Sequence, residues 1–223
     1  MTPLPRALDE RRLVVLDVDS TLITAEVIEL LAAHAGSREQ VADITERAMR
    51  GELDFAASLH ARVATLAGLP VSVFADVLAE VSLTPGATEL LAELATRGWP
   101  VALVSGGFQE VVGPLAERLG ITRYRANGLE VVDGVLTGRV RGPVVDRAGK
   151  AAALRSFAAD DEIPLERTIA IGDGANDLDM LTVAGFGIAF NAKPVLAGHA
   201  DAVVRGRLDA VLTLAPFRAT SGD

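Results

Sequence analysis

Residues 13–22 read Leu-Val-Val-Leu-Asp-Val-Asp-Ser-Thr-Leu, and this stretch decides the fold. Its four leading aliphatic residues are typical of a strand that is buried on both faces of a sheet. The strand ends in two carboxylates, Asp17 and Asp19, at the sheet edge where open α/β proteins bind ligands. Two carboxylates this close repel each other, so a bound cation is expected beside them. An acidic turn that only caps a helix is the alternative when the stretch is taken alone.

The composition limits the classes of protein to consider. Half of the 223 residues are hydrophobic and 4% are aromatic, which predicts a mostly aliphatic core. The absence of cysteine excludes disulfides, thiolate catalysis and cysteine zinc sites. A net charge of −9 argues against nucleic acid as a partner, and no apolar run is long enough to span a membrane. The first residues lack the pattern of a signal peptide, so we expect a cytoplasmic protein.

The segment 24–82 is predicted to be helical throughout, in four helices. Ser37 and Gln40 form the pattern of a capping box, and Asp54 is expected to cap the third helix. This much helix is too long for one crossover between neighbouring strands. The predicted domains are therefore an α/β core, residues 1–23 and 83–223, and an inserted helical cap, residues 24–82.

Three further features follow along the chain. A second aliphatic strand at 101–104 precedes Ser-Gly-Gly at 105–107, which we expect to turn into a helix and to hold a phosphate with its N–H groups and hydroxyl. Residues 129–140 are predicted to form a β-hairpin with Asp-Gly at 133–134 as its two-residue turn. Lys150 lies at the start of another helix, and by residue type alone it would be a surface lysine.

A third aliphatic strand, residues 168–171, ends in a turn that contains Asp173, Asn176 and Asp177. The turn does not match the dinucleotide-binding pattern, because Asp177 stands where that pattern has a glycine. If the three strands are neighbours, the side chains at their ends meet at one edge of the sheet. Oxygen ligands without nitrogen or sulfur suit Mg²⁺, which predicts a magnesium site next to a phosphate cradle.

Four short motifs in this order resemble those of the haloacid dehalogenase-like phosphatase superfamily. They are Asp-Val-Asp-Ser-Thr at 17–21, Ser-Gly-Gly at 105–107, Lys150, and Gly-Asp-Gly-Ala-Asn-Asp-Leu-Asp-Met at 172–180. The resemblance spans residues 13–204. It implies an α/β fold with a Rossmann-like doubly wound parallel sheet, a helical cap and a β-hairpin flap. It also implies Mg²⁺-dependent hydrolysis of phosphate monoesters.

The resemblance assigns expected roles to the residues at the motif positions. Asp17 would attack phosphorus as the nucleophile, and Asp19 would act first as general acid and then as general base. The residues expected to hold Mg²⁺ are Asp17, Asp19 through its backbone carbonyl, Asp173 and Asp177. The residues expected to hold the phosphoryl group are Ser105, Gly106, Lys150 and Asn176.

The family members that this chain resembles most act on O-phospho-L-serine and release L-serine and phosphate in the last step of serine biosynthesis. By that resemblance Glu26 would contact the substrate amino group, Arg62 its carboxylate, and Phe55 would close the pocket as an apolar wall. A related phosphatase or phosphotransferase for phosphoethanolamine or homoserine phosphate is the first alternative. A non-catalytic Mg²⁺-binding module is the second. The expected partner is a small-molecule substrate, and the expected assembly is a monomer or a homodimer.

Overall fold

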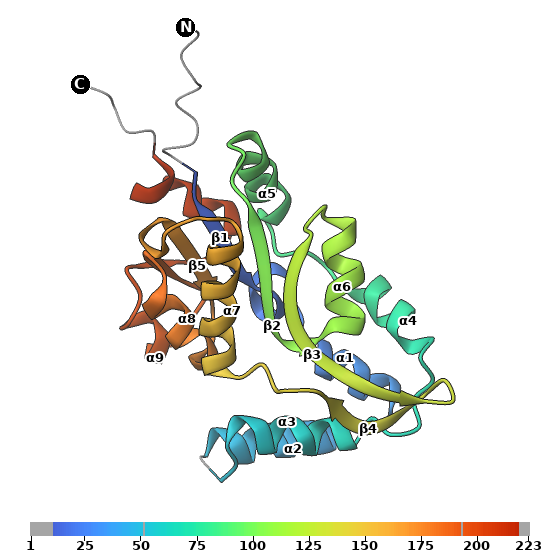
Figure 1. The fold of residues 1–223 in the computed structure, drawn as a ribbon. Coiled ribbons are helices and arrows are strands. Elements are labelled where there is room, and N and C mark those ends of the chain that lie inside the picture. The colour runs from blue at the N-terminus through green and yellow to red at the C-terminus, as the bar shows by residue number, and fades with distance from the viewer. Residues whose placement is uncertain (1–10, 51, 193, 219–223) are drawn as a thin grey trace, which may run out of the picture.

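The computed structural model describes residues 11–50, 52–192 and 194–218, and its centre is a seven-stranded sheet (Figure 1). The strand order is β4-β3-β2-β1-β5-β6-β7. All neighbouring strands are parallel except β3 and β4, which pair antiparallel. The strands are β1 (Leu13–Asp17), β2 (Val101–Phe108), β3 (Arg123–Val132), β4 (Val135–Arg141), β5 (Thr168–Gly172), β6 (Phe186–Phe190) and β7 (Ala202–Val204).

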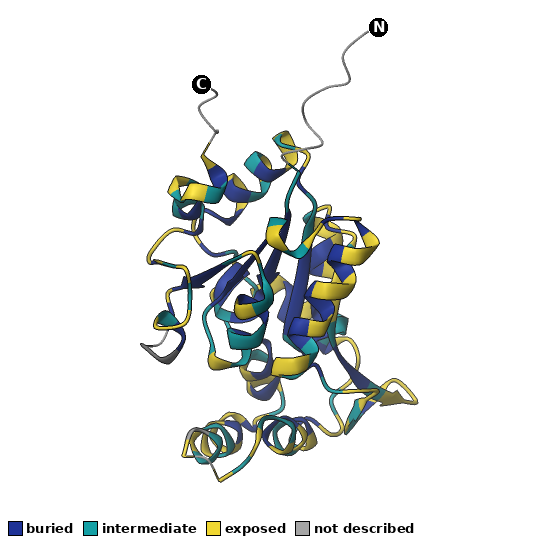
Figure 2. Cartoon of the chain, turned by 60° about the vertical axis from the view of Figure 1, so that its left-hand side comes forward, coloured by how far each residue is buried: buried dark blue, intermediate teal, exposed yellow. Residues whose placement is uncertain are grey.

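Helices cover both faces of the sheet, because successive side chains of a strand point to opposite faces. In β1, Val14 and Leu16 pack in one hydrophobic cluster and Leu13 and Val15 in the other. The first cluster includes α5 (Ala87–Thr96) and α6 (Gln109–Arg118); the second includes α7 (Arg147–Asp160), α8 (Leu178–Val183) and α9 (Pro194–Ala197). The central strands β1, β2, β5 and β6 are mostly buried, whereas the hairpin of β3 and β4 and the outer faces of the helices are exposed (Figure 2). The predicted doubly wound α/β fold is confirmed.

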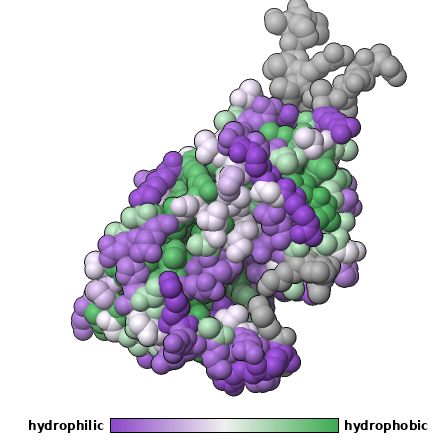
Figure 3. Space-filling view, turned by 180° about the vertical axis from the view of Figure 1, so that it is seen from behind, coloured by the Kyte–Doolittle hydropathy of each residue, from purple (hydrophilic) through white to green (hydrophobic). Residues whose placement is uncertain are grey.

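The segment 24–82 forms four helices: α1 (Val27–His34), α2 (Arg38–Met49), α3 (Phe55–Ala64) and α4 (Val73–Glu80). Helices α1 and α4 pack together, with α4 against α6, while α2 and α3 lie beyond the sheet edge at the bottom of Figure 1. Hydrophilic side chains gather on that lower end in the view from behind (Figure 3). The chain enters and leaves the segment at one place, because Ile23 and Leu83 form an antiparallel bridge.

The predicted hairpin is confirmed, with Asp133 and Gly134 at positive φ in its turn. The connection between α3 and α4 pairs with this hairpin. The N–H of Gly68 donates to the Leu136 carbonyl at 2.8 Å, and the N–H of Leu136 donates to the Leu69 carbonyl at 2.8 Å. The hairpin is therefore hydrogen-bonded to the helical segment 24–82.

Two local predictions were wrong and one was confirmed. Ser105 to Phe108 do not form a turn; β2 continues through them as extended backbone, with a shift in its pairing to β3. The Ser37 hydroxyl does not cap α2, because it is buried and donates to Thr65 Oγ1 at 3.1 Å. Asp54 does cap α3, accepting a hydrogen bond from the Ala57 N–H at 2.7 Å.

Short 3₁₀ helices connect several of these elements. The 3₁₀ helices are Leu165–Arg167, Ala175–Asp177, Leu208–Thr213 and Ala215–Phe217. None of the described helices combines the length and the apolar character needed to cross a bilayer.

Candidate active site

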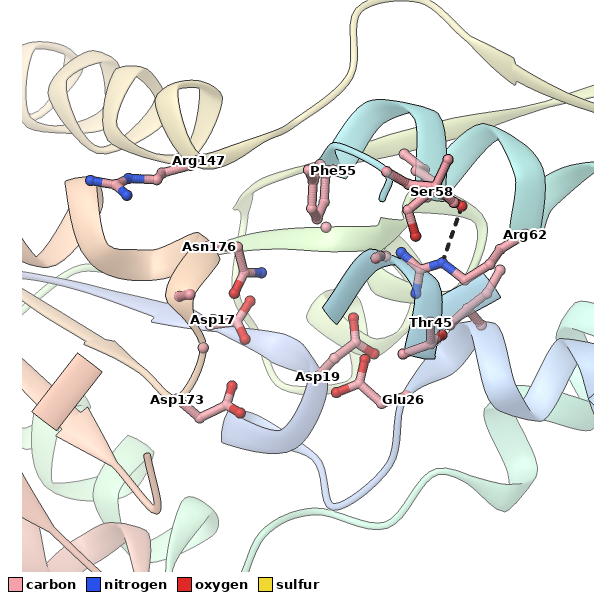
Figure 4. Close-up of a pocket in the computed structure, with 18 of the residues that line it drawn as sticks. Asp17, Asp19, Glu26, Thr45, Phe55, Ser58, Arg62, Arg147, Asp173 and Asn176 are labelled. Atoms are coloured by element: carbon pink, nitrogen blue, oxygen red, sulfur yellow. Dashed lines mark hydrogen bonds between the residues drawn. The ribbon is translucent and has the colours of Figure 1, made fainter. Parts of the chain in front are cut away.

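A cavity of about 520 Å³ lies at the carboxyl ends of β1, β2 and β5, and α3 forms its opposite wall (Figure 4). Eight of the predicted site residues line it: Asp17, Asp19, Glu26, Phe55, Arg62, Gly106, Asp173 and Asn176. The three others are fully buried at or beneath the cavity wall: Ser105 donates to Asp19, and Lys150 donates to both Asp17 and Asp177. The structure thus brings together all the residues that sequence motifs selected from distant parts of the chain.

The turn after β1 separates the two acids. Asp17 ends the strand, and Ser20 adopts a positive φ of 56° in the tight turn that follows. The Asp19 carboxylate accepts hydrogen bonds from the Val27 N–H at 2.9 Å and from the Ser105 hydroxyl at 3.0 Å. Asp19 is therefore held by α1 and β2, on the side of the cavity that faces the helical segment.

Lys150 lies between two carboxylates in the protein interior. Its ammonium donates to Asp17 at 2.5 Å and to Asp177 at 2.6 Å, and the side chain has no exposed area. Burial opposes its charge, but the two carboxylates outweigh this and raise the pKa of Lys150. Asp146 caps the helix α7 that carries it, accepting from the Gly149 N–H at 2.8 Å. The surface-lysine alternative is wrong.

Three carboxylates form a group that fits a cation. Oxygens of Asp17, Asp173 and Asp177 lie within 4.8 Å of one another. Burial and the charge of Asp177 raise the pKa of Asp17 well above its ordinary value and that of Asp173 to about 6. A divalent cation relieves such repulsion, and an all-oxygen donor set suits a hard metal ion. The Asp19 carboxylate is not part of this group, and it accepts hydrogen bonds from Val27 and Ser105 instead.

Asp19 is suited to carry a proton near neutral pH. Burial and the nearby charge of Glu26 raise its pKa to about 7, although the hydrogen bonds from Val27 and Ser105 lower it in part. A carboxyl with such a pKa can donate a proton and later accept one, which is the requirement for general acid–base catalysis.

The wall opposite the acids carries the predicted selectivity residues. Arg62 points into the cavity from α3, and its Nε donates to the Ser58 carbonyl at 3.3 Å (Figure 4). Glu26, on the acid side, accepts from the Ser20 hydroxyl at 2.7 Å. Phe55 lies over Gly106, where a Cβ atom would come within 3.2 Å of its ring. Burial lowers the pKa of Arg62, against the nearby charge of Glu26.

Sequence reasoning missed Asn127, which is fully buried next to the cavity. Its amide donates to the Gly106 carbonyl at 2.8 Å and accepts from the Val145 N–H at 2.7 Å. Asn127 thereby links β2 to the segment that leads into α7. The only signal in the sequence is an amide among strand residues, which does not reveal its partners. The cavity-lining residues Thr45, Ser58 and Arg147 were also missed.

Comparison with known proteins defines the class. The family model for haloacid dehalogenase-like hydrolases matches residues 14–182. The chain belongs to the haloacid dehalogenase-like hydrolase family.

Within this family the chain is similar to phosphoserine phosphatases. It is 61% identical over 205 residues to that of Streptomyces coelicolor, covering 92% of this chain and 50% of the relative. It is 55% identical over 184 residues to that of Streptococcus thermophilus, covering 82% of this chain and 86% of the relative. The solved structure of a phospho-aspartyl intermediate analogue of phosphoserine phosphatase superimposes with a TM-score of 0.85 at 42% identity, covering 91% of this chain and 97% of that one. The chain spans about half the length of the Streptomyces relative.

Proposed function

We propose that this chain hydrolyses O-phospho-L-serine to L-serine and phosphate through an aspartyl-phosphate on Asp17. The observation that carries the proposal is one cavity with Asp17, Asp19 and the buried Lys150 on one side and Arg62 on the other. The similarity to phosphoserine phosphatases over most of the chain supports the choice of substrate. We also propose that the protein is cytoplasmic and that this reaction is the last step of serine biosynthesis.

In the proposed first step, a carboxylate oxygen of Asp17 attacks phosphorus and the bond from phosphorus to the serine oxygen breaks. Asp19 supplies the proton to the departing oxygen. The Lys150 ammonium orients Asp17 and favours its ionised form, in part offsetting the burial and the Asp177 charge that raise its pKa. Water then attacks the phosphorus of the aspartyl-phosphate and gives a proton to Asp19, while the bond from phosphorus to the Asp17 oxygen breaks, which releases phosphate and regenerates the Asp17 carboxylate. Mg²⁺, held by Asp17, Asp173 and Asp177 with the Asp19 carbonyl, would neutralise part of the phosphate charge.

The phosphoryl oxygens would be held by Ser105, Gly106, Lys150 and Asn176. Glu26 and Arg62 would bind the substrate ammonium and carboxylate, and their charges are complementary to these two groups. Phe55 would close the pocket over Gly106. We also propose residues 24–82 as the cap and residues 1–23 and 83–223 as the core. The bridge between Ile23 and Leu83, which brings the entry and exit of the cap together, supports this division.

A panel of phosphate-release assays tests the substrate. O-phospho-L-serine, homoserine phosphate and phosphoethanolamine are compared with Mg²⁺ present, and again after chelation and re-addition of Mg²⁺. We expect the largest kcat/KM for phosphoserine, loss of activity after chelation and recovery with Mg²⁺. A higher kcat/KM for phosphoethanolamine would favour the first alternative, and no release from any of the three would favour the non-catalytic module.

Arg62→Ala should lower kcat/KM for phosphoserine by roughly 10- to 100-fold, the equivalent of about 1.5–3 kcal/mol for a hydrogen-bonded charge pair. Phosphoethanolamine lacks the carboxylate, so its kcat/KM should change little. Arg62→Lys is the matched variant and should recover little, because a point charge cannot form the two parallel bonds of a guanidinium. Steady-state kinetics on both substrates provide the test, and equal losses would mean that Arg62 serves the phosphate or the fold.

Asn127→Asp should lower kcat/KM by about tenfold on phosphoserine and p-nitrophenyl phosphate alike, because it replaces the donor to the Gly106 carbonyl with an acceptor. The acceptor for the Val145 N–H is retained, while the bond to Gly106 is lost and the ionised carboxylate adds a buried negative charge. Kinetics are measured together with the melting temperature. A lower melting temperature with unchanged kinetics would assign Asn127 to the fold alone.

A further inference from the structure

One face of α3 lines the cavity and contains a serine. Phe55, Ser58, Leu59 and Arg62 follow the spacing that places residues on the same side of a helix, and all four line the cavity. Ser58 is 3% exposed, and its hydroxyl points into the cavity (Figure 4). Among the described residues this hydroxyl has no hydrogen-bond partner, although its backbone carbonyl accepts from Arg62.

The other hydroxyl that lines the cavity, on Thr45 of α2, is different. It donates to the Val41 carbonyl at 2.8 Å, one turn earlier in the same helix. This local bond is the usual arrangement for a hydroxyl inside a helix. Ser58 does not use it, so its hydroxyl is available to a molecule in the cavity. Although the residue is only 3% exposed, its oxygen is not one of the buried side-chain atoms without a partner, among which Glu110 Oε2 is the one found in the described residues, so the Ser58 hydroxyl is reached from the cavity.

The hydrogen bond from Arg62 Nε to the Ser58 carbonyl also places the Ser58 hydroxyl and the terminal nitrogens of Arg62 near each other. Arg62 uses Nε to contact the Ser58 carbonyl, and no hydrogen bond from its two terminal nitrogens to a described residue is found. These nitrogens point into the same cavity as the Ser58 hydroxyl (Figure 4). A carboxylate has two oxygens with several acceptor positions, so it can accept from both residues at once.

We propose that the Ser58 hydroxyl donates to the substrate carboxylate beside Arg62, and that the two residues form one subsite selective for phosphorylated amino acids over phosphorylated amines. This inference rests on the proposed function. The subsite thus combines a neutral donor, the Ser58 hydroxyl, with a cationic donor, the Arg62 guanidinium. Arg62 discriminates by charge, and the Ser58 hydroxyl discriminates by position, because a hydroxyl bonds only to an acceptor within its reach.

Ser58→Ala tests the subsite, because it removes only the hydroxyl oxygen and leaves the carbonyl that holds Arg62. We expect kcat/KM for phosphoserine to fall about three- to tenfold, mostly through KM, and the value for phosphoethanolamine to change less than twofold. The melting temperature should not fall, since no bond within the protein is lost. Thr45→Val is the matched control: it removes the cavity hydroxyl that already has a partner, and the ratio between the two substrates should stay the same.

The double variant Ser58→Ala/Arg62→Ala tests whether the two residues bind the same substrate carboxylate or affect kcat/KM independently. In the Arg62→Ala background, Ser58→Ala should have a smaller effect, because the carboxylate is no longer held in place. Equal changes on both substrates, or no change on phosphoserine, would overturn the inference. A wild-type chain that does not hydrolyse phosphoserine would instead overturn the proposed function, and the subsite with it.

Discussion

Replacing Asp17 with asparagine is expected to lower phosphate release from O-phospho-L-serine by on the order of 10⁴-fold or more, the scale of losing a catalytic nucleophile. An amide cannot form the acyl phosphate that the proposed mechanism requires. The fold should be retained, because Lys150 keeps its bond to Asp177 at 2.6 Å and the repulsion among the buried carboxylates decreases. Steady-state phosphate release and the melting temperature are measured on the same preparation.

Asp160→Asn is the matched control for this variant. Asp160 is exposed at the last turn of α7, the helix that carries Lys150 at its other end. Its replacement makes the same chemical change away from the cavity and should leave turnover within about twofold, as for most surface substitutions. Near-normal turnover by Asp17→Asn would exclude Asp17 as the nucleophile.

Asp19→Asn is expected to have the second largest effect, and the effect should depend on the leaving group. General acid–base catalysis contributes about 10²- to 10⁴-fold, so phosphoserine turnover should fall on that scale. The serine alkoxide needs a proton to depart, whereas p-nitrophenolate departs without one. The environment of Asp19, with a pKa of about 7 and bonds to Val27 and Ser105, supports this role.

A stopped-flow measurement distinguishes the two steps that Asp19 would serve. With p-nitrophenyl phosphate, Asp19→Asn should release a burst of nitrophenolate close to one equivalent of enzyme and then turn over slowly. The first step needs no acid with this substrate, but hydrolysis of the aspartyl-phosphate still lacks its base. A variant that loses the burst and the steady rate equally on both substrates would indicate that Asp19 acts through the metal site.

The parts of the fold that local chemistry determines could be predicted from the sequence. The aliphatic run before Asp17 makes a strand buried on both faces, Asp-Gly at 133–134 makes a hairpin turn, and Asp54 caps a helix. The short strands β6 and β7 were not predicted. β7 has three residues, and its pairing with β6 decides its structure more than its own sequence does.

The parts of the site that depend on distant partners could not be predicted from residue type. Lys150 is buried because Asp17, 133 positions away, and Asp177 satisfy its ammonium. Asn127 is a positioning residue only because the fold brings Gly106 and Val145 to it. Ser105 to Phe108 were expected to turn, but both glycines keep extended backbone and the strand pairs with β3 again at Phe108. In each case tertiary contacts outweighed the local preference.

The most direct test of phosphoserine hydrolysis through Asp17 is the transfer of label from free L-serine into O-phospho-L-serine during turnover. An aspartyl-phosphate can be attacked by serine as well as by water, so the mechanism predicts that labelled serine enters the phosphoserine pool while phosphate is released. The transfer should disappear in Asp17→Asn and persist in Asp160→Asn. Rapid hydrolysis of phosphoserine without any transfer, even at high serine concentration, would contradict a covalent intermediate on Asp17.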